Sequence, residues 1–232
     1  MKIMSKRLIV AIDGPAGAGK STLARRVAER IGAVYIDTGA MYRAIALWAI
    51  RQGIPCDDHH RLESLTNHAR IEFLPDYGRI ALNGEDVSSA IRTPEVATAA
   101  SQVAAISGVR KALVTIQREI ATHASVVMEG RDIGSVVFPD ADIKIYLDAS
   151  TDIRARRRAA ELAEKQIQVD FNDLRQQIEE RDSRDRNRAA SPLLQAADAT
   201  YLDSSNLSPE DVEEEILRII RSKTSNGKVL VS

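Results

Sequence analysis

The residues best suited to chemistry in this chain form one glycine-rich segment, Gly-Pro-Ala-Gly-Ala-Gly-Lys-Ser, at residues 14–21. Glycines at these positions let backbone N–H groups turn inward onto phosphate oxygens, and a helix that begins there adds its partial positive charge. In such a loop Lys20 reaches the β- and γ-phosphates of a nucleoside triphosphate, and the Ser21 hydroxyl reaches Mg²⁺. The segment therefore predicts a phosphate-binding P-loop.

The sequence around the loop predicts a strand before it and a helix after it. Residues 8–12 form a continuous apolar run, which is typical of a buried strand. Residues 34–36 predict a second short strand, and residues 41–52 a second helix that Gly53 ends. This alternation is typical of a parallel sheet covered by helices. Apolar residues recur at helical spacing after the loop, up to a capping glycine, at Leu23, Val27, Ile31 and Gly32.

The middle of the chain departs from this alternation. Short strand-like segments are separated by turn residues, and Asn83-Gly84 is a strong hairpin signal because both residues accept positive φ. A three-stranded antiparallel meander within a parallel α/β fold predicts an inserted lobe. The segments are strands at 70–74, 79–82 and 85–87, helices at 93–106 and 109–123 broken by Ser107-Gly108, strands at 125–128 and 143–147, and a helix at 209–221 before a frayed tail.

The composition excludes several classes of protein. The formal net charge of the 232 residues is −1 and aromatic residues are 4%, which disfavours a nucleic-acid-binding protein. The single cysteine, Cys56, excludes an internal disulfide. No apolar run is long enough to span a bilayer, and no signal peptide precedes the first strand. We expect a soluble, cytoplasmic monomer.

Two clusters of arginine lie in the second half of the chain. Each repeats at three- or four-residue spacing, so each forms a stripe on a predicted helix. Such runs are usually solvated helix faces. Beside a P-loop they favour a mobile lid, whose arginines neutralise the charge of a phosphoryl group in transfer and whose closure excludes water. The clusters are Arg154, Arg157 and Arg158, and Arg181, Arg184 and Arg188.

Polar motifs also follow two predicted strands. Asp37-Thr38-Gly39 follows the strand at 34–36, and Glu129-Gly130-Arg131-Asp132 follows the strand at 125–128. Open α/β sheets bind ligands outside the carboxyl ends of their strands. We therefore expect both motifs to meet the P-loop at one edge of the sheet.

Five longer motifs closely resemble the bacterial cytidylate kinases, over about residues 8–220. The resemblance implies an α/β, three-layer P-loop NTPase fold with a five-stranded parallel sheet, an inserted antiparallel monophosphate-binding lobe and a helical lid. It places the core at 1–61 and 109–222, the lobe at 62–108, the lid at about 154–188 and a flexible tail at 223–232. The motifs are 37–43, 91–96, 100–104, 129–141 and 181–188.

The resemblance implies Mg²⁺-dependent transfer of the γ-phosphoryl group of ATP to CMP or dCMP. Catalytic roles would belong to Lys20, Arg131, Arg181, Arg184 and Arg188. ATP would be bound by Gly14, Pro15, Ala16, Gly17, Ala18, Gly19, Lys20, Ser21 and Thr22, with Arg157 and Arg158. CMP would be bound by Thr38, Arg43, Ser101, Arg110, Arg131, Asp132, Asp185 and Arg188.

The metal would be bound by Ser21, with Asp37 and Asp132 acting through water, because Mg²⁺ usually keeps several waters. The attacking phosphate oxygen is already ionised, so no general base is needed and no catalytic histidine is expected. We expect His59, His60, His68 and His123 to be exposed, and Trp48 to lie in the core.

Three other functions remain open on the sequence. A P-loop kinase acting on UMP, AMP or a non-nucleotide alcohol is the nearest alternative. A GTP-dependent switch would normally carry an Asn-Lys-x-Asp stretch, and none occurs in this sequence. A nucleic-acid-dependent ATPase is disfavoured by the charge and the few aromatic residues.

Overall fold

A computed structural model describes residues 7–74, 78–164, 166–188 and 190–225. Its main sheet has five strands in the order β2-β6-β1-β7-β8, and every pairing between neighbours is parallel. The predicted five-stranded parallel sheet is therefore confirmed. The strands are β1 (Ile9–Asp13), β2 (Val34–Asp37), β6 (Val126–Gly130), β7 (Ile143–Asp148) and β8 (Thr200–Asp203).

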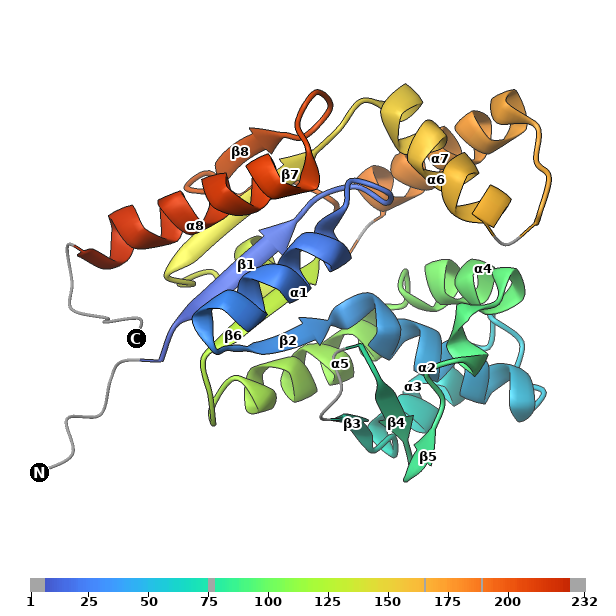
Figure 1. Cartoon of the computed structure of the whole chain (residues 1–232). Helices are drawn as coiled ribbons and strands as arrows, with labels where there is room; N and C mark the ends of the chain where they lie inside the picture. Colours follow the sequence, from blue (N-terminus) through green and yellow to red (C-terminus); the bar gives the residue numbers. More distant parts are fainter. Residues whose placement is uncertain (1–6, 75–77, 165, 189, 226–232) are drawn as a thin grey trace, which may run out of the picture.

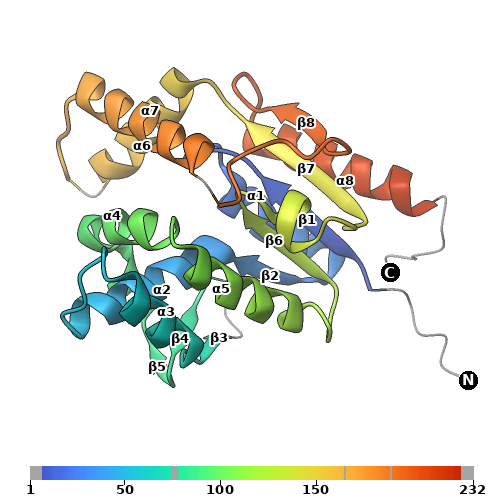
Figure 2. The ribbon, with the colours of Figure 1, turned by 180° about the vertical axis from the view of Figure 1, so that it is seen from behind.

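Helices cover both faces of this sheet and make it the middle of three layers. α1 (Lys20–Ile31) and α8 (Pro209–Ser225) cover one face, and α5 (Ser107–Ile120) lies on the other, as Figures 1 and 2 show from opposite sides. Central strand residues such as Val10 and Val127 are fully buried against the first pair of helices. Burial of apolar side chains on both faces explains why these strands are short continuous apolar runs.

The start of the second helix differs from the sequence prediction. α2 (Thr38–Arg51) begins three residues before the predicted position at 41, and it ends one residue before the predicted end at 52. The Asp37 carboxylate caps its N-terminus by accepting a 2.9 Å hydrogen bond from the Ala40 N–H. An aspartate that ends a strand and caps a helix leaves no loop between the two elements.

The predicted inserted sheet is present and antiparallel. β3 (Ile71–Phe73) pairs with β4 (Ile80–Leu82), which pairs with β5 (Glu85–Asp86). Asn83 and Gly84 have φ values of 52° and 85°, as the hairpin prediction requires.

The surroundings of the small sheet reach beyond the predicted lobe of 62–108. α3 (His59–Asn67), the 3-10 turn η1 (Ala90–Arg92) and α4 (Pro94–Val103) lie beside it. Its apolar cluster also includes residues of α2 and α5, such as Ile45 and Leu113. The lobe therefore shares one core with helices outside the predicted bounds.

The predicted helix break at Ser107-Gly108 is wrong. α4 ends at Val103, and both residues belong to the first turn of α5. Gly108 packs closely on α3, because a Cβ there would lie 2.1 Å from the Glu63 carboxyl carbon. This glycine therefore permits a close helix–helix approach rather than ending a helix.

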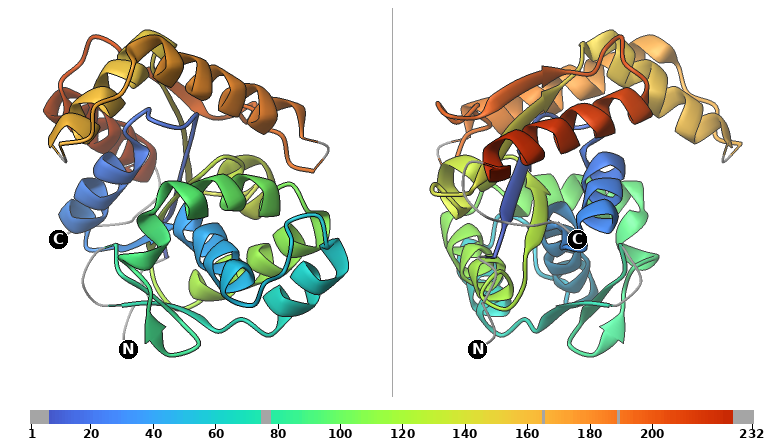
Figure 3. Two further views of the ribbon diagram at one scale, coloured as in Figure 1. Left: turned by 90° about the vertical axis from the view of Figure 1, so that its right-hand side faces the viewer. Right: turned by 60° about the vertical axis from the view of Figure 1, so that its left-hand side comes forward.

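A helical hairpin occupies the segment predicted to be a lid, and we refer to this hairpin as the lid. α6 (Thr151–Glu164) packs against α7 (Phe171–Asn187) through a small apolar cluster of Ala155, Leu174 and Ile178. Figure 3 shows this hairpin on the same side of the molecule as α4. Arg188 follows α7 in an extended conformation, so it does not continue the helical stripe predicted for Arg181 and Arg184.

α8 continues to Ser225, which lies beyond the predicted end at 221. The flexible tail was predicted at 223–232; its first three residues belong to α8 instead, and 226–232 lie outside the described residues. Within the described part of the chain, no helix combines the length and apolar character needed to cross a membrane.

Candidate functional site

Three polar segments meet at the carboxyl ends of adjacent strands, as predicted. The P-loop follows β1, Thr38 follows β2, and Arg131 follows β6, which lies between β1 and β2. The Thr38 hydroxyl donates a 2.8 Å hydrogen bond to the Glu129 carbonyl and so joins two of the three segments. The topology therefore brings together residues about a hundred positions apart in the chain.

The P-loop leaves a helix N-terminus open to an anion. Gly19 occupies the N-cap position of α1 with φ +92°, and no side chain caps the first turn. The uncapped N–H groups of that turn are suited to phosphate oxygens. Gly14 approaches β7 so closely that a Cβ would lie 1.9 Å from the Leu147 carbonyl oxygen.

Lys20 is buried in this loop. Its side-chain ammonium donates a 2.7 Å hydrogen bond to the Pro15 carbonyl, and the residue is only 4% exposed. Burial, together with the nearby Arg131 guanidinium, lowers the pKa of Lys20 to about 7. Lys20 therefore lies in a site where an anionic ligand would be strongly favoured.

Oxygen ligands gather beside this lysine. The Tyr35 hydroxyl donates a 3.1 Å hydrogen bond to the buried Glu129 carboxylate, and the Ser21 hydroxyl interacts with both. Burial and the neighbouring Asp37 carboxylate raise the pKa of Glu129. Two carboxylates and a hydroxyl are hard oxygen ligands of the kind that Mg²⁺ prefers. The described residues hold no group of three or more His, Cys, Asp or Glu able to bind a metal unaided.

A second set of charges lies on the side of α4 and α5. Arg110 is buried, forms an ion pair with Asp132 and lies over the Tyr42 ring, with 5.5 Å from guanidinium carbon to ring centroid. Arg188 approaches the other Asp132 oxygen at 3.9 Å. Arg110 Nε and Arg188 Nη2 are buried without a hydrogen-bond partner. Buried donors without partners are rare, so these two N–H groups are candidates to bind a ligand.

Arg131 lies between the two sets. Its Nε donates a 3.0 Å hydrogen bond to the Asp185 carboxylate on the lid. Its positive charge also lowers the pKa of Lys20. Burial alone would raise the pKa of Asp185, but the charge of Arg131 and its hydrogen bond lower it. Burial and the charge of Arg131 lower the pKa of Arg181 to about 10. Arg131 thus connects the P-loop, the sheet and the lid.

Arg43, also predicted to bind the acceptor, comes from α2. Its guanidinium donates a 2.8 Å hydrogen bond to the Asp37 carboxylate, and the side chain is about a quarter exposed. A Cβ at Gly39 would lie 3.1 Å from this guanidinium. Glycine at that position therefore leaves room for the arginine beside the site.

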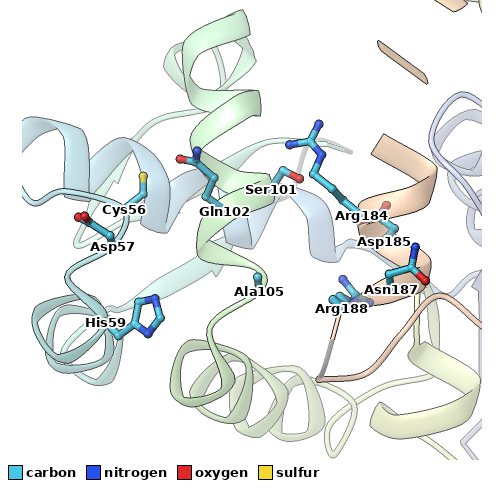
Figure 4. A pocket seen from close by; sticks show the side chains of 10 residues that line it. All are labelled: Cys56, Asp57, His59, Ser101, Gln102, Ala105, Arg184, Asp185, Asn187 and Arg188. Carbon is cyan, nitrogen blue, oxygen red and sulfur yellow. The ribbon is translucent and has the colours of Figure 1, made fainter. Parts of the chain in front are cut away.

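A cavity lies between the lobe and the lid. It has a volume of about 560 Å³, and Figure 4 shows the α7 side chains on one wall facing α4 and the start of α3. The predicted acceptor residues Ser101, Asp185 and Arg188 line it. The cavity is also lined by Cys56, Asp57, His59, Gln102, Ala105, Arg184 and Asn187.

The first arginine cluster of the lid divides into different environments. Arg154 is buried; it donates to the Ala16 carbonyl of the P-loop at 3.1 Å and to Asp182 of α7 at 2.6 Å. Arg157 donates to the Ser204 carbonyl at 2.7 Å. Arg158 is exposed and pairs with Glu161 within the same helix. The three arginines therefore share a helical stripe but differ in environment: Arg154 is buried against the P-loop, Arg157 is half-buried and Arg158 is on the surface.

Asp13 was not predicted from the sequence as a site residue. Its two carboxylate oxygens accept hydrogen bonds of 2.8 and 2.7 Å from the N–H groups of Ile133 and Gly134. These residues begin the π-helical turn η2 (Ile133–Val137) that follows Asp132. Burial raises the pKa of Asp13 to about 6. A charged residue ending an apolar strand was the available signal.

The predicted exposure of the histidines and the predicted packing of Trp48 in the core are confirmed. The four histidines are exposed, although His59 lines the cavity. Trp48 is partly buried and packs against the core around α2.

Comparison with known proteins identifies the family. The sequence model of the family described as cytidylate kinase matches residues 10–222. The chain belongs to the cytidylate kinase family. A cytidylate kinase of Solibacter usitatus is 58% identical over 225 residues, 96% of each chain. A cytidylate kinase of Pasteurella multocida is 46% identical over 220 residues, which cover 94% of this chain and 97% of the relative.

Two further proteins are similar to this chain, one in sequence and one in fold. A bifunctional pantoate ligase/cytidylate kinase of Synechococcus is 47% identical over 93% of this chain, which spans 41% of that protein. A solved structure of an uncharacterized protein from Eubacterium ventriosum aligns with a TM-score of 0.52 at 13% identity, over 94% of this chain and 99% of that one. This last similarity concerns the fold alone. Family membership confirms the resemblance drawn from the sequence motifs.

Proposed function

We propose that this chain transfers the γ-phosphoryl group of ATP to CMP or dCMP, giving ADP and CDP or dCDP. The position of Arg131 carries the proposal. On one side the charge of this guanidinium lowers the pKa of Lys20 in the P-loop. On the other side the guanidinium forms an ion pair with Asp185 of the lid. A kinase needs such a positive charge between its donor and its acceptor, where the transferred phosphoryl group passes.

The donor would bind at the P-loop. The backbone N–H groups of the uncapped first turn of α1 would bind its phosphates, and Lys20 would exchange the Pro15 carbonyl for a phosphate oxygen. Negative phosphates beside the buried ammonium would raise the pKa of Lys20 from about 7. Binding of ATP near neutral pH would therefore fix Lys20 in its charged form.

The residues present fit a magnesium ion. Ser21 and the carboxylates of Asp37 and Glu129 offer oxygen ligands beside Lys20. Mg²⁺ bound there would neutralise charge on the phosphates. Asp132 forms its ion pair with Arg110 and lies near Arg188, so its proposed contact with the metal would depend on water.

The acceptor would lie between the lobe and the lid. Arg43, Arg131 and Arg188 would hold its monophosphate. Unpartnered N–H groups at Arg110 and Arg188 support this placement, because a bound nucleotide would supply the missing acceptors. The cytosine edge would contact Ser101, Arg110 and Asp132, and Thr38 and Asp185 would complete the site.

Reaction would then depend on positioning and charge. The acceptor phosphate is ionised at neutral pH, so its oxygen needs no proton removed before it attacks the γ-phosphorus in line. Lys20 and Arg131, with Arg181, Arg184 and Arg188, would neutralise the charge that develops during transfer. Closure of α6 and α7 would exclude water and prevent hydrolysis of ATP. We further propose that the protein acts as a cytoplasmic monomer without a nucleic-acid partner.

A panel of acceptors tests the proposal. ADP release would be measured with ATP, Mg²⁺ and, separately, CMP, dCMP, UMP, AMP or GMP. Rapid release only with the cytidine nucleotides supports the assignment, because a fitted polar site rejects a base with the wrong hydrogen-bonding edge. Equal turnover of AMP and CMP would overturn the cytosine assignment and favour a kinase of broader acceptor range.

A further inference from the structure

Lys144 is a buried charge that the proposed reaction does not use. It lies in β7 and is 5% exposed. Its ammonium donates to both carboxylate oxygens of Asp198, at 2.9 and 2.8 Å, and also to the Pro139 carbonyl. The Asp198 side chain is 67% exposed, so the pair joins the interior of the sheet to the surface.

The stem of Lys144 supports the turn that follows Arg131 and Asp132. A Cβ at Gly134 would lie only 3.1 and 3.2 Å from the Lys144 Cδ and Cγ atoms. The Gly134 N–H is fixed from the other side by its 2.7 Å hydrogen bond to Asp13. Lys144 therefore packs directly against the backbone two residues beyond Asp132.

Asp198 lies at the far end of the connector, residues 190–199, that leads from α7 to β8. Near its first end the Leu193 N–H donates a 2.8 Å hydrogen bond to the Asp185 carbonyl, and the Leu193 side chain is buried. The Arg188 guanidinium also donates to the Ser191 carbonyl. Figure 2 shows the chain leaving α7 and returning to β8. The connector is thus attached to acceptor residues at one end and to Lys144 at the other.

We propose that Lys144 and Asp198 are positioning residues for acceptor binding. By fixing the end of the connector against the sheet, the pair holds Asp185 and Arg188 opposite Arg131 and Asp132. The inference rests on the proposed function, because it concerns the same acceptor site. The hydrogen bonds found for the Lys144 ammonium go to Pro139 and Asp198 and not to the P-loop, so we expect the pair to affect binding of CMP more than binding of ATP.

Stability alone would not require a partner from the connector. The Asp198 side chain is 67% exposed, so the ion pair itself contributes little beyond the hydrogen bonds of the buried ammonium. The pair instead joins the connector, which is hydrogen-bonded to Asp185 and Arg188, to a lysine that packs against the turn after Asp132. Such a connection affects the relative position of those residues and therefore affinity for one substrate.

Calorimetry tests the proposal with CMP and, separately, a nonhydrolysable ATP analogue. The variants are Asp198→Asn, Lys144→Met and their combination. We expect each to weaken CMP binding about tenfold and to leave analogue binding within about twofold of wild type. The double variant should be no weaker than either single variant, because both changes break one connection.

Two further variants serve as controls. Asp198→Glu keeps the carboxylate at an exposed position and should retain CMP binding. Glu215→Gln removes an exposed carboxylate that pairs with Arg218 on α8, away from the connector, and should bind CMP as wild type does.

Two results would overturn the inference. One is wild-type CMP affinity in Asp198→Asn and Lys144→Met, with a lower melting temperature as the sole change. The other is equal weakening of CMP and the ATP analogue. Failure of the proposed function would look different, because the wild-type protein itself would neither bind nor phosphorylate CMP.

Discussion

Replacement of the P-loop lysine should abolish activity and, at neutral pH, make the free protein more stable. Lys20 is 4% exposed, and the one hydrogen bond found for its ammonium among the described residues is to the Pro15 carbonyl. Its burial is unfavourable for the charged form, as the lowered pKa of Lys20 shows. Lys20→Met keeps the length of the side chain and removes the charge.

The magnitude follows from the pKa of Lys20, which falls from 10.5 to about 7 on folding. One pKa unit corresponds to about 1.4 kcal/mol, so at pH 7 the burial of this amine costs about 4 kcal/mol of unfolding free energy. Loss of the hydrogen bond to Pro15 removes about 1 to 2 kcal/mol. Lys20→Met should therefore be more stable by about 2 to 3 kcal/mol, which raises Tm by at least about 4 °C.

The gain should depend on pH. Between pH 7 and 10.5 the unfolded chain binds more protons at Lys20 than the folded chain, so wild-type stability rises with pH across this window. The variant lacks this contribution. Urea unfolding at about pH 7 and about pH 9.5 should show its advantage shrinking by about 3 kcal/mol.

Lys144→Met is the matched control, because Lys144 is equally buried but has a carboxylate partner in Asp198. Its loss should lower stability by about 1 to 3 kcal/mol. Turnover of Lys20→Met with ATP and CMP should fall at least about a thousandfold. A Lys20→Met protein less stable than wild type at pH 7, by an amount independent of pH, would refute the reasoning.

Three further changes have defined outcomes. Asp185→Asn removes the charged partner of Arg131. In steady-state kinetics it should raise KM for CMP about tenfold and leave KM for ATP little changed. An equal rise in both KM values would mean that Asp185 is not on the acceptor side. Arg110→Met leaves Asp132 buried without its main partner and should lower unfolding free energy by about 3 kcal/mol or more in urea titrations; unchanged stability would mean that the pair is not buried in solution. Gly14→Ala forces a Cβ to within 1.9 Å of the Leu147 carbonyl oxygen and should lose ATP binding in calorimetry, whereas Gly53→Ala, with open space around its Cβ position, should bind ATP normally.

The sequence predicted the elements whose signals are local. Gly32 caps α1 with φ +64°, and the turn at Asn83-Gly84 has two positive φ values. Periodicity did not indicate α3, a helix with a weak apolar face on which only Leu62 and Thr66 are buried. β8 was missed because half-buried and exposed residues alternate along it, without an apolar run. Short elements at the edge of a fold depend on the neighbours against which they pack.

In the site, too, features with a local sequence signal could be predicted and features that depend on packing could not. The P-loop and the convergence of its neighbours could be predicted, because motif and strand order are enough to place them. Partner choice could not be predicted. Arg154 reads as one of three equivalent lid arginines in the sequence, yet it is buried against the P-loop and Asp182. Such pairings depend on segments that only the folded chain brings together, as do the roles of Asp13 and Lys144.

Phosphorus NMR of the reaction products tests the central claim most directly. The protein would be mixed with ATP, Mg²⁺ and an excess of CMP, with Lys20→Met as the inactive control. We predict that CDP and ADP appear in equal amounts, that inorganic phosphate stays negligible, and that the control forms neither. Release of ADP with inorganic phosphate and without CDP would mean that the site hydrolyses ATP and that the acceptor residues have another role.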